Sequence, residues 1–165
     1  MKFIMKCAKD GLFVKLCPMS DASRKRYEDE ELVLRFFAYS DNYTQFRHDV
    51  DNFLTAYVKT KARKFDEALM KREFSDMLKF VQKHFPYGFT KNERAKTTPR
   101  VRFEAISVGV ILALREEPKL VPDNPRSWLE AEAFEKETTT HASNSLQRLR
   151  SRVEFVRDHL LELKA

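Results

Sequence analysis

The sequence predicts an all-α protein, a single helical domain of about six helices. From residue 27 onward, apolar residues recur at intervals of three and four, the spacing that places side chains on one face of a helix. Fourteen phenylalanines against six prolines and three glycines favour long elements around an aromatic core over a loop-rich or all-β scaffold. The length of 165 residues suits one domain. Only residues 1–23 show a less regular pattern.

Two helices are expected in the first half of the chain. Four acidic residues at 28–31 precede the apolar run 32–38, and carboxylates in a first turn complement the helix dipole. This pattern predicts a largely buried helix that ends in a turn at 40–42. A second helix follows, with one apolar stripe made of Phe46, Val50, Phe53, Leu54 and Tyr57.

The next two helices are separated by a loop at residues 86–97. The first has an apolar face and ends at Pro86, because proline cannot continue a helix. The members of that face are Phe65, Leu69, Met77, Leu78, Val81 and Phe85. The second begins with Thr98 as the N-cap and Pro99 at the first helical position, and residues 101–114 are apolar nearly all round. It is therefore expected at the centre of the core, where Gly109 would permit close approach of a neighbouring helix.

The last third of the chain predicts two further helices. Asn124 and Pro125 form a start signal before Trp128. The final helix begins near Ser143 or Ser145. Its apolar positions follow a heptad-like spacing, at Leu146, Leu149, Val153, Val156, Leu160 and Leu163. This seam packs either inside the domain or on a partner helix, so an oligomer formed through residues 146–163 is one expectation.

Several classes of function are excluded by composition. Gly11, Gly88 and Gly109 lie too far apart to form a glycine-rich loop around a nucleotide phosphate. No apolar stretch is long enough for a membrane span, and we expect no signal peptide because charged residues interrupt the apolar run at residues 1–10. Cys7 and Cys17 are expected to be unpaired thiols in a cytoplasmic protein.

Catalytic and metal sites are not expected either. The four histidines, His48, His84, His141 and His159, lack a second histidine at helical spacing, so exposed or core-edge positions are favoured over metal ligands. Residues 138–141, three threonines and a histidine, fit a loop and helix start better than a nucleophile with its base. We therefore expect no catalytic residue, no metal ligand and no cofactor.

The segment 86–102 is the strongest candidate for binding. It carries five basic side chains against one acidic residue, Glu93, and the chain as a whole has a net charge of +6. The candidate nucleic-acid-binding residues are Tyr87, Lys91, Arg94, Lys96, Arg100 and Arg102. A phosphate could be held by these cations and by the N-terminus of the following helix, and a base could stack on the aromatic rings of Tyr87 and Phe89. The alternative is a solvated loop that its aromatic residues anchor to the core.

Four blocks of the sequence, in this order, resemble one protein family. They are RYEDEELVLRFFAYSDNY at 26–43, VDNFLTAYV at 50–58, FVQKHFPYGF at 80–89 and TPRVRFEAISVGVILAL at 98–114. The resemblance is to the helical C-terminal region of domain-of-unknown-function family 262, which includes the S half of Gmr-type modification-dependent restriction systems. It extends over residues 13–161. Glu31, Arg35, Arg102 and Glu104 fall at charged positions of the family pattern, and we expect them in buried ion pairs or in contacts to another half of the protein.

The resemblance also implies what the rest of such a protein does. Family members look like ParB/sulfiredoxin-type proteins, whose N-terminal half uses a DGQQR motif to bind and hydrolyse nucleotides. Because that motif is absent here, the chain is expected to be the helical half of a split or truncated member. Its expected role is that of a non-catalytic accessory region of a restriction or phage-defence-type protein. The expected partners are the nucleotide-binding N-terminal half, or an upstream gene product, and DNA. The alternative is a stand-alone basic helical nucleic-acid-binding protein, and an enzyme active alone is the least favoured reading.

Overall fold

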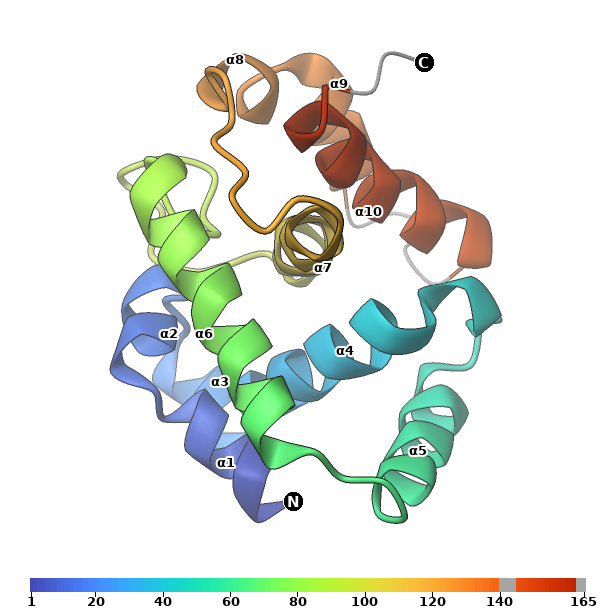
Figure 1. The fold of residues 1–165 in the computed structure, drawn as a ribbon. Coiled ribbons are helices and arrows are strands. Elements are labelled where there is room, and N and C mark those ends of the chain that lie inside the picture. Colours follow the sequence, from blue (N-terminus) through green and yellow to red (C-terminus); the bar gives the residue numbers. More distant parts are fainter. Residues whose placement is uncertain (140–144, 163–165) are drawn as a thin grey trace.

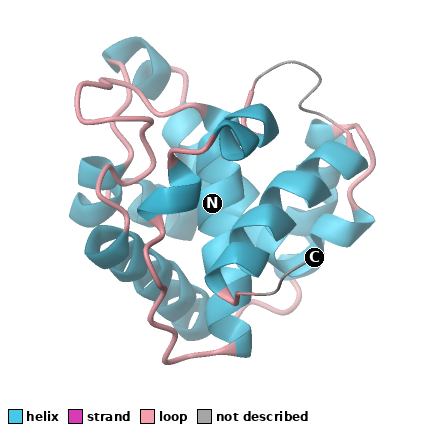
Figure 2. Cartoon of the chain, turned by 90° about the horizontal axis from the view of Figure 1, so that it is seen from above, coloured by secondary structure: helices cyan, strands magenta, loops and turns pink. Residues whose placement is uncertain are grey.

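Every regular element of the described residues is a helix. In the computed structural model, residues 1–139 and 145–162 are described, and they form ten α-helices and one 3₁₀ helix without a strand (Figure 2). The all-α prediction is confirmed. The expected number of about six is too low, because residues 1–25 and 126–137 form short helices in place of longer or less regular segments.

The N-terminal segment contains three short helices. They are α1 (Lys2–Ala8), α2 (Gly11–Leu16) and α3 (Asp21–Lys25). The side chain of Asp10 accepts hydrogen bonds from the backbone N–H groups of Leu12 and Phe13. Ser20 caps α3 in the same way through the N–H of Ser23. These two N-caps explain why a stretch without a long apolar period is still helical.

The second pair of elements departs from the predicted boundaries. Helix α4 (Glu28–Asn42) runs through the expected turn at 40–42, and the 3₁₀ helix η1 (Tyr43–Gln45) follows it. Helix α5 (Val50–Lys61) starts at its N-cap Asp49. Phe46 therefore lies between helices, yet it is buried, with its ring centroid 5.6 Å from that of Tyr39.

Helix α6 (Glu67–His84) ends before Pro86 as predicted, but its first apolar positions are not in the core. The N-cap is Asp66, so Phe65 precedes the helix, and its side chain remains 48% exposed. Leu69 is 40% exposed. Both predictions for the core face were wrong because the helix begins later than the apolar stripe suggests.

Helix α7 (Arg100–Glu116) occupies the centre of the molecule. Figure 1 shows it end-on, with α4, α6 and α10 around it, and these three helices make its main helix contacts. Twelve of its 17 residues are buried, which confirms the predicted central helix. Its N-cap is Pro99, one residue beyond the expected Thr98.

The C-terminal region contains α8 (Arg126–Leu129), α9 (Glu132–Glu137) and α10 (Leu146–Leu160). Ser145 caps α10 through the N–H of Arg148, whereas the alternative start, Ser143, lies outside the described residues. The seam residues Leu149, Val153, Val156 and Leu160 are buried, and α10 packs on α7. The described part of the seam thus packs inside the chain, which is one of the two expected arrangements, and the oligomer through residues 146–163 stays a prediction. Leu163 lies outside the described residues.

Gly109 explains how α7 and α10 pack so closely. A Cβ atom at this position would lie 2.5 Å from Cβ of Val156 and 2.9 Å from the carbonyl oxygen of Val153. No real side chain tolerates such distances without displacing its neighbour. The predicted role of Gly109 in close helix approach is confirmed.

Candidate nucleic-acid interface

The loop at residues 86–99 is fixed at both of its ends. The backbone N–H of Phe89 donates to the carbonyl oxygen of Leu16 at 3.1 Å, and the N–H of Thr98 donates to that of Pro18 at 2.9 Å. Phe89 itself is fully buried. Because these hydrogen bonds hold both ends of the loop, the charges it carries need little further ordering on binding.

Gly88 makes the turn at the start of this loop possible. Its φ is +58°, and a Cβ atom there would lie 2.8 Å from the carbonyl oxygen of Leu16. Both the backbone conformation and the close contact require glycine.

Four of the six predicted binding residues lie on the surface. Lys91, Arg94, Lys96 and Arg100 are all exposed. The ion pairs of Lys91 with Glu135 and of Arg100 with Glu104 are long, with 3.8 Å between Lys91 Nζ and Glu135 Oε1 and 3.8 Å between Arg100 Nε and Glu104 Oε1. Within the described ranges, no carboxylate forms an ion pair with Arg94 or Lys96. The loop therefore presents weakly compensated positive charge.

The other predicted contacts are not surface groups. Arg102 is buried, and its Nε–H donates to the carbonyl oxygen of Thr90 at 3.0 Å. The hydroxyl of Tyr87 accepts a hydrogen bond from Nη2 of Arg126 at 3.1 Å, and this guanidinium lies over the Tyr87 ring. Because Phe89 is buried and one face of Tyr87 is covered, the loop does not offer the pair of stacking rings that its sequence suggested.

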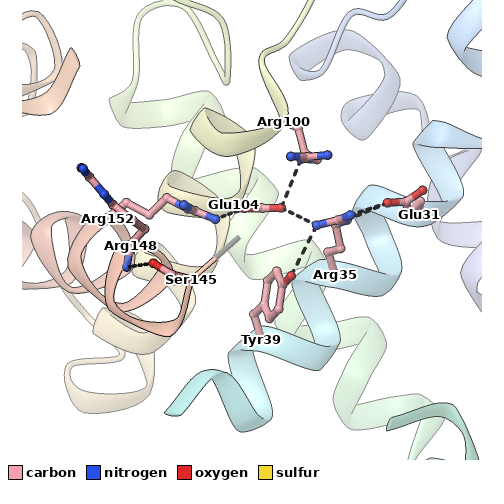
Figure 3. A network of polar contacts seen from close by, with 8 residues as sticks. All are labelled: Glu31, Arg35, Tyr39, Arg100, Glu104, Ser145, Arg148 and Arg152. Atoms are coloured by element: carbon pink, nitrogen blue, oxygen red, sulfur yellow. Dashed lines mark hydrogen bonds and ion pairs between the residues drawn. The ribbon is translucent and has the colours of Figure 1, made fainter. Parts of the chain in front are cut away.

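Three of the four charged positions expected from the resemblance, Glu31, Arg35 and Glu104, meet in an ionic centre around Glu104 (Figure 3). Glu104 is 1% exposed and lies on α7. Its Oε1 accepts from Nη1 of Arg35 at 2.9 Å, and its Oε2 accepts from Nη2 of Arg152 at 2.6 Å. Glu31 binds Arg35 from the solvent side at 2.6 Å. The centre joins α4, α7 and α10, so these charged residues hold the helices together.

The electrostatics of this centre favour the ionised guanidinium. Burial by itself would lower the pKa of Arg35, but the charge of Glu104, with smaller contributions from Tyr39 and Glu31, raises it above its ordinary value. Burial raises the pKa of Tyr39 to about 12, and the nearby Glu104 carboxylate adds to this effect. At neutral pH the Tyr39 hydroxyl is therefore protonated, 3.4 Å from Nη1 of Arg35.

Sequence reasoning missed Arg152 as a member of the centre. It stood among four arginines, Arg148, Arg150, Arg152 and Arg157, that do not form one stripe on the last helix. Spacing offered a signal, because Arg152 lies three residues after Leu149 and four before Val156. Those neighbours belong to the buried seam, so the helix period places Arg152 beside it.

The charged positions expected from the resemblance differ in their contacts within the chain. Arg35 and Glu104 form a buried ion pair, and Glu31 pairs with Arg35 at the surface. Arg102 is not part of this network: it donates to the carbonyl oxygen of Thr90 and lies over the ring of Phe134. Contacts of these residues to another half of the protein stay a prediction.

The described histidines lie at or near the surface. His48 and His159 are exposed and His84 is half-buried, while His141 lies outside the described residues. Thr138 is buried, and its hydroxyl donates to the carbonyl oxygen of Phe134 at 2.8 Å. This is the bond of a helix end; the last two residues of the segment 138–141 lie outside the described residues.

Neither thiol belongs to a disulfide, and both are buried. Among residues 1–139 and 145–162, no group of three histidine, cysteine or acidic side chains is arranged to hold a metal ion. In the same part of the chain, no helix combines the length and the apolar character that crossing a membrane requires.

Comparison with known proteins gives no relative for this chain. No family model matches it, and neither the curated proteins nor the solved structures yield a match.

Proposed function

We propose that this chain is a non-catalytic helical accessory region of a restriction or phage-defence-type protein, and that it contacts nucleic acid through the loop at 86–99 and Arg100. The observation that carries the proposal is a set of four exposed cations. Lys91, Arg94 and Lys96 lie on a loop with both ends fixed, and Arg100 begins α7 directly after it. Phosphate backbones are recognised by such charge, and binding releases counterions. Nucleotide hydrolysis would reside in a separate half, as the family resemblance implies.

The ionic centre supports an accessory role. Arg35, Glu104 and Arg152 would be attractive catalytic candidates by residue type, but each is buried and bonded to another member of the centre. Their charges are used to join three helices. The chemistry left at the surface is that of binding, which is the contribution we assign to this chain.

Charge reversal in the loop tests the proposal. We expect the wild-type chain to bind a labelled DNA duplex or single strand with an affinity that falls steeply as salt rises. The double variant Arg94→Glu/Lys96→Glu should lose at least about tenfold in affinity, and its salt slope should become shallower.

A matched control separates the effect of net charge on DNA affinity from the effect of the loop itself. Arg63 and Lys64 are also adjacent exposed cations, and no described carboxylate forms an ion pair with them. The variant Arg63→Glu/Lys64→Glu changes the net charge by the same amount and should lose less than about threefold. Equal losses in both double variants would mean that the loop is not the binding surface.

A partner half is supported by a different observation. An apolar pocket of about 430 Å³ lies between α1, α5 and α6, lined in part by Met1, Phe65 and Met70. Exposed apolar side chains at such a pocket are typical of an interaction site. We propose that the nucleotide-hydrolysing half packs here. Co-expression with the upstream gene product should yield a stable complex, and Phe65→Asp should abolish it, while the exposed substitution Lys64→Asp should not.

A further inference from the structure

A second feature of the same region is a pocket that contains Arg102. It has a volume of about 340 Å³ and is lined by Tyr87, Lys91 and Asn92 from the loop, by Arg102 from α7, and by residues of the segment that carries α8 and α9. Pockets for small ligands start at about 300 Å³, so this pocket suits a small group or the end of a longer molecule.

Arg102 is a buried cation without a carboxylate partner in the described chain. It is only 5% exposed, and its hydrogen bond to Thr90 uses one of the five N–H donors of a guanidinium. Its Cζ lies 4.9 Å from the centroid of the Phe134 ring. The similarly buried Arg35 and Arg152 differ, because both bind Glu104. Burial lowers the pKa of Arg102 to about 10, and the Glu135 carboxylate at the same pocket opposes this shift only in part.

The other polar groups of the pocket are suited to an anion. Lys91 supplies an ammonium group and Asn92 an amide at its wall. Two acidic residues also line it, but Glu130 is paired with Arg126 at 2.8 Å. Glu135 lies 3.8 Å from Lys91 and its side chain is 66% exposed, so an anion could replace it as the partner of that lysine. The free N–H groups of Arg102 and the ammonium of Lys91 would then share one ligand.

The charge and the depth of the pocket define the ligand. A guanidinium with a lysine beside it matches an oxyanion with several oxygen atoms, above all a phosphate. A phosphodiester inside a strand is flanked by sugars on both sides and stays at the protein surface. A terminal phosphate has one free end, so it is able to reach a buried arginine.

We infer that the Arg102 pocket binds the terminal phosphate of a nucleic-acid strand whose backbone lies along the exposed cations of the loop. This inference rests on the proposed function. Arg102 would select the strand end, while Arg94 and Lys96 would supply affinity that is independent of the end group. The two contributions are therefore separable by mutation.

The test compares oligonucleotides that differ only at their ends. Single strands of one sequence carry a 5′-phosphate, a 3′-phosphate or hydroxyls at both ends, and their Kd values for the intact chain are measured. We expect one phosphorylated form to bind about 10- to 100-fold more tightly than the hydroxyl form, the gain of a charge-assisted hydrogen-bond pair. Arg102→Gln should remove this preference and leave the Kd of the hydroxyl form unchanged.

Two further measurements keep the outcome clear. If Arg102→Gln does not fold, the exposed variant Lys91→Gln carries the test and should reduce the preference at least about threefold. Inorganic phosphate serves as the competitor that represents a free anion. Equal Kd values for all three wild-type strands would overturn the inference and leave the proposed function standing. Binding of inorganic phosphate in an Arg102-dependent manner, without binding of any strand, would overturn both the strand-end ligand and the proposed nucleic-acid contact.

Discussion

Nη1 of Arg35 donates to Oε1 of Glu104 at 2.9 Å, across the contact between α4 and α7. Both side chains are almost fully buried, and 69 residues separate them in the sequence. Arg152 completes the arrangement from α10 by binding the second carboxylate oxygen. One carboxylate thus links three helices that meet in the core.

Removal of the Glu104 charge is expected to be strongly destabilising. Glu104→Gln removes the buried carboxylate that both Arg35 and Arg152 bind, and Glu31 reaches Arg35 only from the solvent side, so the free energy of unfolding should fall by about 3–5 kcal/mol. Urea denaturation followed by circular dichroism measures this loss. The control is Glu31→Gln, which removes the solvent-exposed partner of Arg35 and should cost at most about 1 kcal/mol. Similar losses in both variants would contradict a central role for Glu104.

The contact between α7 and α10 predicts an effect of a single methyl group. Gly109→Ala places a carbon 2.5 Å from Cβ of Val156, and such overpacking should cost about 1–3 kcal/mol despite the better helix propensity of alanine. The second substitution Val156→Ala in the same chain should recover part of the loss in a thermal or urea unfolding experiment. Gly11→Ala is the control, because nothing lies within 4 Å of its added Cβ, and no loss is expected there. An unchanged free energy of unfolding in Gly109→Ala would mean that α7 and α10 lie farther apart than in this structure.

The contacts of Arg115 predict that lysine at this position gives a less stable protein. Its Nε and Nη2 bind the two oxygens of Glu73 at 2.7 and 2.8 Å, while Nη1 binds the carbonyl oxygen of Ser40 at 2.5 Å. Lysine keeps the charge but not this planar set of donors, so Arg115→Lys should lower the free energy of unfolding by about 1–2 kcal/mol. The exposed Arg72→Lys on α6 should leave it unchanged. If Arg115→Lys and Arg72→Lys lower the free energy of unfolding by equal amounts, the loss comes from replacing arginine by lysine in general and not from the contacts of Arg115.

The cysteines predict a pH dependence of reactivity and stability. Burial raises the pKa of Cys7 to about 11 and that of Cys17 to about 12, from 9.0 for an ordinary thiol. At pH 8 both thiols should react with a disulfide reagent far more slowly in the folded chain than in urea.

The sign of the stability change follows from proton binding. Between pH 9 and about pH 11, the unfolded thiols lose protons that the folded thiols retain, so the free energy of unfolding falls as the pH rises. The urea midpoint under reducing conditions should therefore be lower at pH 10 than at pH 8. The double variant Cys7→Ala/Cys17→Ala should show a smaller difference, and an unchanged difference would assign the effect to other groups.

The sequence alone determined the helical class and most of the core. Apolar spacing identified α7 as the central helix and the seam of α10, and the end of α6 followed from Pro86. These features depend on local rules of period and backbone chemistry that act within a few residues. The same rules placed Lys91, Arg94 and Lys96 on a loop after α6 and Arg100 at the start of the next helix, and all four are exposed in the structure.

Only the tertiary structure decided what each charged residue does. Arg100 and Arg102 lie two positions apart, yet the first is at the surface and the second is buried against Thr90 and Phe134. Neither residue type nor spacing distinguishes them, because the outcome depends on which distant segment covers that side of α7. The meeting of Glu104 with Arg35 and Arg152 has the same cause: burial and ion pairing are set by packing between helices far apart in the sequence, which no local pattern contains.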